Sequence, residues 1–288
     1  MTPNTLNTLL RHAGQHDKLK PSAIEHISIN VAKPPILVDT LAEHTLLAFI
    51  LSGEQEIFLG EQCYTVQAGD VLFVPFNMPI KVQFKLDKRP QFVSLNLALD
   101  EKWLGEIIQK IQTINHHASS SGVAVTKMTD PVQNCLARLI DQLDDPNLAL
   151  AELYKQELMV HLLSTPLGAS LTAFVSQDSH LHKIKKASDH LYAHFADKIT
   201  VAQLADLSGM GESSFYHHFK AVTGFSPLQY QKQLRLNHAN FLILTEKRSV
   251  SETAFAVGYE SLSQFSREYK RAFGVSPRDD VDKNTAFG

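Results

Sequence analysis

Short apolar runs, broken by glycine and proline, fill residues 44–99, which include the stretch TLLAFILSGEQEIFLGEQCYTVQAGDVLFVPFNMPIKVQFKL. The breaks are Gly53, Gly60, Gly69 and Pro75. Their spacing of roughly ten residues is typical of an antiparallel sandwich or barrel. Gly69-Asp70 suits a tight turn, because glycine reaches positive φ at little cost. The pattern therefore predicts a β region early in the chain.

The periodicity changes after this β region. The stretches PVQNCLARLIDQLDD and ELYKQELMVHLLSTPLG place apolar residues three and four apart, the spacing of one helix face. Pro166 and Gly168 are expected to end the second helix. The two helices, within residues 131–166, either cover the barrel or pair with another subunit. We expect a linker at 167–181, followed by a mostly helical region at 182–288.

One stretch of this helical region occurs twice. Residues 213–227 read SSFYHHFKAVTGFSP, and residues 263–277, fifty positions later, read SQFSREYKRAFGVSP. On a helix, two aromatic residues of each copy fall four apart on one face, and hydroxyl, amide and cationic side chains occupy the opposite face. These aromatic pairs are Phe215 and Phe219 in the first copy and Phe265 and Tyr269 in the second. Each copy therefore predicts a helix with an anchoring face and a polar outer face.

A short helix is expected before each copy. An apolar face that ends at a glycine is present in both ITVAQLADLSGM and SVSETAFAVGYE. Thr200 and Ser249 suit the N-cap positions of these two helices. Helix, glycine turn and helix make a helix-turn-helix, at about 200–223 and again at about 249–273. Between them, PLQYQKQLRLNHANFLILT predicts one connecting helix about 27 Å long. With this spacer the two units can read adjacent major-groove faces, which lie ~34 Å apart.

The repeated units resemble the DNA-binding domain of the AraC/XylS family of bacterial transcription regulators. The resemblance covers about residues 182–277 and is based on the stretches GESSFYHHFKAVTGFSPLQYQKQLRLNHA and VGYESLSQFSREYKRAFGVSP. The earlier part of the chain resembles the AraC-type N-terminal domain with its cupin-like barrel, through ILSGEQEIFLG, YTVQAGDVLFVP and DSHLHKI.

This resemblance implies an α+β protein with two domains. A cupin-like sensor and dimerisation domain is expected at 1–166, and a tandem helix-turn-helix domain at 182–288. The implied function is a sequence-specific regulator that binds promoter or operator DNA and responds to a small molecule through its barrel. The resemblance also implies contact with RNA polymerase, and a homodimer that joins through residues 131–165.

The outer faces of the two copies supply the candidate DNA contacts. A guanidinium such as that of Arg267 can bond both acceptors of a guanine edge, and Gln264 suits adenine by the same geometry. Lys220, Lys270 and Arg271 suit phosphates. The resemblance implies base contacts at the matching positions, and His217 stands where the family often has an arginine. The expected base contacts are Ser213, Ser214, His217, Ser263, Gln264 and Arg267.

Charge is distributed unevenly along the chain. Residues 1–179 carry 13 Lys and Arg against 19 Asp and Glu, whereas residues 180–288 carry 14 against 11. The mildly basic second part favours a polyanionic partner, but its small excess disfavours a protein that coats DNA nonspecifically. No apolar run approaches the ~18 residues of a membrane-spanning helix. The N-terminal residues do not have the pattern of a secretory signal. We therefore expect a cytoplasmic protein with no membrane association.

A metal-dependent enzyme of the cupin type, with a helical accessory domain, is the alternative function. The cupin metal-ligand motifs are missing, and His44 stands alone. Three groups of neighbouring histidines have no cysteine or carboxylate at ligand spacing. They are His116-His117, His217-His218, and His180 with His182. We therefore expect no metal, no cofactor and no enzyme activity, and an effector that binds in a mostly apolar pocket.

The two cysteines, Cys63 and Cys135, are too few for a disulfide framework. Cys63 is either a redox sensor or a small buried hydrophobe, and a thiol in a strand is more often the latter.

Overall fold

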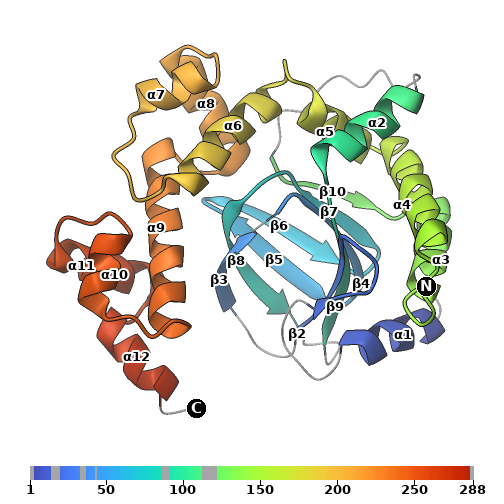
Figure 1. Cartoon of the computed structure of the whole chain (residues 1–288), viewed down its shortest axis with the longest axis horizontal. Helices are drawn as coiled ribbons and strands as arrows, with labels where there is room; N and C mark the ends of the chain where they lie inside the picture. Colours follow the sequence, from blue (N-terminus) through green and yellow to red (C-terminus); the bar gives the residue numbers. More distant parts are fainter. Residues whose placement is uncertain are drawn as a thin grey trace.

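The computed structural model describes residues 3–13, 20–32, 37–42, 44–85, 91–111 and 122–285. Strands dominate the earlier part of the chain and helices the later part, which confirms the expected α+β class with two regions (Figure 1). In Figure 1 the helical region lies to the left of the sheets, and α9 (Pro227–Leu244) runs beside them.

The strands of the described residues form two antiparallel sheets. The six-stranded sheet has the order β1-β2-β9-β4-β7-β10, and the four-stranded sheet the order β3-β8-β5-β6. The strands of the six-stranded sheet are β1 (Lys20–Pro21), β2 (Ile27–Ala32), β4 (Leu46–Ser52), β7 (Asp70–Val74), β9 (Phe92–Ala98) and β10 (Ala124–Lys127). The strands of the four-stranded sheet are β3 (Leu37–Ala42), β5 (Glu54–Leu59), β6 (Gln62–Gln67) and β8 (Met78–Lys85). We refer to the two sheets together as the barrel.

Sequence pattern and burial agree in the strands. Every residue of β7 is buried, because its sheet packs on the core with one face and under helices with the other. In β5, buried and partly exposed residues alternate, as expected for a strand with one face toward the core and one face toward solvent. Fully buried aromatic rings fill the core, among them Phe49, Phe73 and Phe92. The predicted turn glycines Gly60 and Gly69 have φ of 60° and 95°, in the left-handed region.

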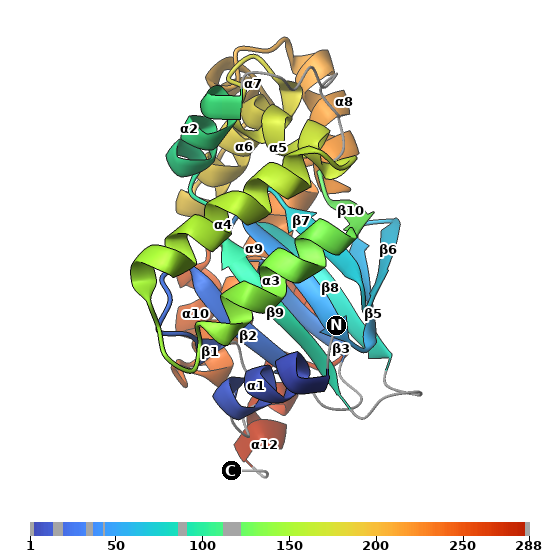
Figure 2. The same ribbon diagram turned by 90° about the vertical axis from the view of Figure 1, so that its right-hand side faces the viewer.

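Helices cover the outer face of the six-stranded sheet. In Figure 2, α3 (Asp130–Asp141) and α4 (Leu148–Leu163) cross in front of the strands. Of the two alternatives for these helices, covering the barrel is therefore observed. One side of α4 still presents exposed apolar residues, Leu153 and Val160. The other helices of this region are α1 (Pro3–Ala13) and α2 (Glu101–Ile111).

The linker expected at 167–181 is wrong. Leu167–Val175 forms helix α5, and α6 begins at His180. Pro166 occupies the N-cap of α5, because the fixed φ of proline suits the start of a helix as well as a stop after the preceding one. The ring of Phe174 packs edge-on against Phe73 with 5.9 Å between centroids, so α5 is part of the barrel core.

The helical region continues to the end of the described residues. Its helices are α6 (His180–Ala193), α7 (Val201–Leu207), α8 (Glu212–Thr223), α9, α10 (Val250–Ala256), α11 (Leu262–Phe273) and α12 (Pro277–Thr285). Among the described residues no single helix is both long and apolar enough to cross a membrane, and only α4 and α5 together, bent by 111°, meet that test.

Candidate nucleic-acid interface

The first predicted helix-turn-helix consists of α7 and α8. Thr200 caps α7 and forms a capping box with Gln203, which satisfies the free backbone N–H groups of the first turn. The chain turns at Gly209, with φ of 60°. Phe215 and Phe219 of α8 are completely buried, and their ring centroids are 5.3 Å apart. The predicted anchoring face of this unit is therefore confirmed.

The second unit, α10 and α11, repeats this construction. The Ser249 side chain caps α10 by accepting from the backbone N–H of Glu252, and the turn falls at Gly258 with φ of 86°. Phe265 and Tyr269 are completely buried. The Tyr269 hydroxyl donates to the Asp280 carboxylate over 2.8 Å, so the anchoring face of α11 also holds α12, which the sequence did not indicate.

The outer faces of α8 and α11 are exposed, as the pattern predicts. Each residue expected to contact DNA is exposed in the free chain: Ser213, Ser214, His217 and Lys220 on α8, and Ser263, Gln264, Arg267, Lys270 and Arg271 on α11. Two of these residues already form hydrogen bonds with neighbouring side chains. Ser263 Oγ lies 2.8 Å from Ser261 Oγ, and Gln264 Nε2 donates to Glu268 over 3.3 Å. Glu268 therefore orients the amide that the sequence assigns to adenine.

A residue that the sequence analysis missed connects the two units. Arg235 of α9 donates to the carbonyl oxygens of Phe195, Ala196 and Asp197 before α7, and to that of Gly258 in the second turn. These distances lie between 2.7 and 3.2 Å. Burial lowers the pKa of the Arg235 guanidinium from its usual value. One half-buried cation thus joins the segment before the first helix-turn-helix unit to the turn of the second.

Histidine rings stack at the side of α8. His180 of α6 and His218 are parallel with 3.7 Å between centroids, and His217 meets His218 edge-on at 5.4 Å. Burial, and then repulsion from His180 and His217, lowers the pKa of His218. Nearby, His182 is buried, with Nδ1 3.2 Å from the Phe174 carbonyl oxygen. These histidines belong to the packing around α8.

Two hollows lie between the helix-turn-helix units and the barrel. One, of about 350 Å³, lies between Glu61 and Gln62 of the barrel and Tyr216, His217 and Lys220 of α8. The other, of about 260 Å³, lies between the barrel, α9 and α11, and Arg271 lines it. Three of the residues expected to meet DNA therefore border the barrel.

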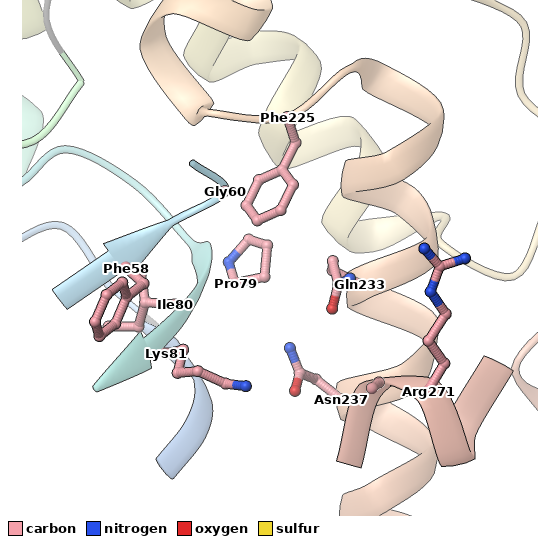
Figure 3. A pocket seen from close by; sticks show the side chains of 10 residues that line it. Phe58, Gly60, Pro79, Ile80, Lys81, Phe225, Gln233, Asn237 and Arg271 are labelled. Atoms are coloured by element: carbon pink, nitrogen blue, oxygen red, sulfur yellow. The ribbon is translucent and has the colours of Figure 1, made fainter. Parts of the chain in front are cut away.

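Figure 3 shows the second hollow. The Lys81 side chain extends from β8 toward the amide of Asn237 on α9, and Gln233 lies one helical turn away. Pro79 and Phe225 supply an apolar wall. This arrangement suits a small molecule with an anionic end and an apolar body.

The described residues contain no group of three or more His, Cys, Asp or Glu side chains that could hold a metal ion. His116 and His117 lie outside the described residues. Cys63 is exposed on β6, so its interpretation as a buried hydrophobe is wrong, because its side of β6 faces solvent. Cys135 is buried against the Tyr154 carbonyl oxygen at 3.2 Å, and burial raises the pKa of its thiol to about 12.

Relatives of this chain are transcriptional regulators. Probable transcriptional regulator LumQ of Photobacterium leiognathi is 31% identical over 147 residues, 47% of this chain and 59% of LumQ. The Msm operon regulatory protein of Streptococcus mutans is 22% identical over 261 residues, 85% of this chain and 87% of that protein. The chain covers only 31% of an uncharacterized HTH-type transcriptional regulator of Staphylococcus aureus, so it spans less than two thirds of several relatives. None of these matches supports the metal-dependent enzyme.

A similar fold occurs in ToxT of Vibrio cholerae. The structure of ToxT superimposes with a TM-score of 0.60 at 14% identity, over 89% of this chain and 98% of ToxT. A helix-turn-helix domain model matches residues 204–281, and the model of the AraC-type transcriptional regulator N-terminus matches residues 23–170, more than half of the chain. The chain therefore belongs to the AraC-type transcriptional regulators.

Proposed function

We propose that this chain binds double-stranded DNA sequence-specifically, with α8 and α11 as the two reading helices. The observation that carries the proposal is the pair of exposed polar faces on helices that α9 and Arg235 hold at one separation. Arg267 and Gln264 would bond base edges, together with Ser213, Ser214, His217 and Ser263. Lys220, Lys270 and Arg271 would contact phosphates. Such a regulator acts at promoter or operator DNA, which supports the expected cytoplasmic location.

The test begins with duplexes selected from a random library by the full chain, followed by fluorescence anisotropy at fixed salt. Arg267→Ala is expected to weaken binding by about 1–3 kcal/mol. Lys102→Ala, an exposed cation on α2 of the barrel side, serves as the control and should leave affinity unchanged. Equal affinities of wild type and Arg267→Ala would remove α11 from base reading.

A small-molecule effector and protein partners complete the proposal. Solved structures of ToxT include one with a bound unsaturated fatty acid, which supports an amphipathic acid as effector class. The hollow beside Lys81 places a cation next to the apolar side chains of Pro79 and Phe225, which supports the same effector class. Octanoate should raise Tm more than octanamide, and Lys81→Met should abolish the difference. Equal shifts for both compounds would exclude this site.

Dimerisation and contact with RNA polymerase are part of the same proposal. The exposed Leu153 and Val160, seven residues apart on one side of α4, support an interface between two copies of the chain. A dimer would bring four helix-turn-helix units to one stretch of DNA, where recruitment of RNA polymerase would follow.

A further inference from the structure

The turn between β5 and β6 makes backbone contact with the end of the first reading helix. Gly60 forms this turn with φ of 60°, and Gly224 ends α8 with φ of 74°. A Cβ atom at position 60 would overlap the carbonyl oxygen of Gly224. A Cβ atom at position 224 would overlap the carbonyl oxygen of Leu59. The two backbones therefore touch with no side chain between them, which only glycine at both positions permits.

Other contacts hold the barrel to the same helices. At Gly122, just before β10, a Cβ atom would overlap the carbonyl oxygen of Val222 in α8. The Asn77 carbonyl oxygen, between β7 and β8, accepts from the Ser188 hydroxyl over 3.3 Å and also from the Tyr230 hydroxyl. Tyr230 is completely buried, and burial raises the pKa of its hydroxyl. Ser188 Oγ and the Tyr230 hydroxyl also lie 2.6 Å apart, so the two hydroxyls and the Asn77 carbonyl oxygen form one hydrogen-bonded cluster across the contact.

The docked turn lies beside residues proposed to contact DNA. Glu61, next to Gly60, borders the same hollow as His217 and Lys220 of α8. On the other side, Gly60 borders the hollow that Arg271 of α11 lines, as Figure 3 shows. The turn thus borders a hollow beside each reading helix, next to cations that would approach phosphates. The Glu61 carboxylate also carries the charge sign of a phosphate, so it repels the DNA backbone.

We infer that the β5–β6 turn, residues 59–62, competes with DNA for the first reading helix. The inference rests on the proposed DNA-binding function. The docked chain is the weak-binding form, and a duplex engages α8 fully only after the turn has moved away. If docked chains outnumber undocked ones by about ten to one, the apparent Kd is about tenfold weaker than that of the undocked chain.

The first test compares Gly60→Ala with Gly69→Ala. Gly60 lies in the turn before β6 and Gly69 in the turn after it, both with φ in the left-handed region, but a Cβ atom at position 69 meets nothing within 4 Å. Both alanines therefore add similar backbone strain, and only the one at position 60 pushes the barrel from α8. Gly60→Ala is expected to bind the selected duplex about three- to tenfold more tightly than wild type. Gly69→Ala should bind as wild type does.

The repeat supplies a second pair of variants. Gly224 and Gly274 end α8 and α11 at equivalent positions, with φ of 74° and 78°. Each donates its N–H to the lysine four residues earlier over 2.9 Å. A Cβ atom at position 274 meets nothing within 4 Å, whereas one at position 224 meets the barrel. Gly224→Ala should therefore increase affinity, and Gly274→Ala should not.

Amide hydrogen exchange reports the docking itself. Peptides that cover residues 54–67 and 217–230 should exchange faster in Gly60→Ala and Gly224→Ala than in the two control variants. Faster exchange together with unchanged or weaker DNA binding would overturn the inference, and so would unchanged exchange in both variants. The proposed function fails separately, if the wild-type chain and all four variants select no sequence from the library.

Discussion

Buried and exposed side chains alternate within each reading helix, so stability and binding depend on different residues. In α8, Phe215 and Phe219 are completely buried, whereas His217 between them is exposed. In α11, Arg267 is exposed between Phe265 and Tyr269. Truncation of a buried ring removes apolar contacts and leaves a cavity, which costs about 3–5 kcal/mol. Substitution of the exposed residues leaves the fold intact, so their effects report on binding.

The stability of the chain should depend on pH through His218. The folded chain holds the pKa of His218 below its usual 6.5, because of burial and of repulsion from His180 and His217. Below about pH 6.5 the unfolded chain therefore binds more protons at this site, and folding stability falls as pH decreases. His218→Gln should lose less Tm than wild type between about pH 7 and pH 5.

The exposed His44, replaced by glutamine, is the control for this measurement and should behave as wild type does. An identical fall of Tm in His218→Gln and wild type would exclude the histidine stack as the source of the pH dependence.

At the level of elements, α9 connects the two units, and the hydrogen bonds of Arg235 support a role in fixing their relative orientation. The four backbone carbonyl groups that Arg235 holds belong to segments on both sides of α9. Together these hydrogen bonds connect the segment before α7 with the turn after α10. A rigid spacing of two reading helices corresponds to a rigid spacing of two boxes in the DNA site.

Replacement of Arg235 by alanine should lower stability by about 2 kcal/mol and relax this spacing. The measurement compares the selected duplex with one that carries an extra base pair between the boxes. Wild type should lose more than tenfold in affinity on the insertion, and Arg235→Ala should lose less. Lys232→Ala, one turn earlier on α9, should discriminate as wild type does. Equal discrimination by Arg235→Ala would contradict the positioning role.

Local patterns were sufficient to predict the helix-turn-helix units. The caps at Thr200 and Ser249 and the turns at Gly209 and Gly258 depend on neighbouring residues, and the structure confirms them. The connecting helix Pro227–Leu244 also follows from its sequence, which has no glycine or proline after its first residue. The DNA contacts on the outer faces stay predictions, because exposure alone does not identify a partner.

Features that depend on distant residues could not be read from the sequence. Proline suits both the stop of one helix and the start of the next, so Pro166 alone does not indicate that helix α5 follows it. Arg235 looked like any other cation on a helix, because its carbonyl partners are 23 to 40 positions away. The contact of Gly60 with Gly224 was equally hidden, because it joins two turns from different parts of the chain.

For the whole molecule, the barrel is both a neighbour of the reading helices and the proposed site of dimerisation. Its four-stranded sheet faces α9, while α4 on the opposite side carries the exposed Leu153 and Val160 (Figures 1 and 2). The same domain can therefore meet a second copy on one side while it restrains the DNA-binding units on the other.

The dimer proposal predicts a change of sedimentation. Wild type should sediment as a dimer at micromolar concentration, and Leu153→Asp as a monomer, because a buried charge would disrupt an apolar interface. Leu228→Asp, which alters an exposed leucine on α9, is the matched control and should remain dimeric. A wild-type chain that is monomeric both with and without DNA would contradict the interface.

The most direct test of the account determines which base pairs each reading helix recognises. Sequences selected by the full chain from a random library should contain two boxes, about one helical turn of DNA apart. Arg267→Ala should lose base preference in one box, and His217→Ala in the other. A single box, or a loss of preference in the same box for both variants, would contradict the claim that α8 and α11 read one duplex together.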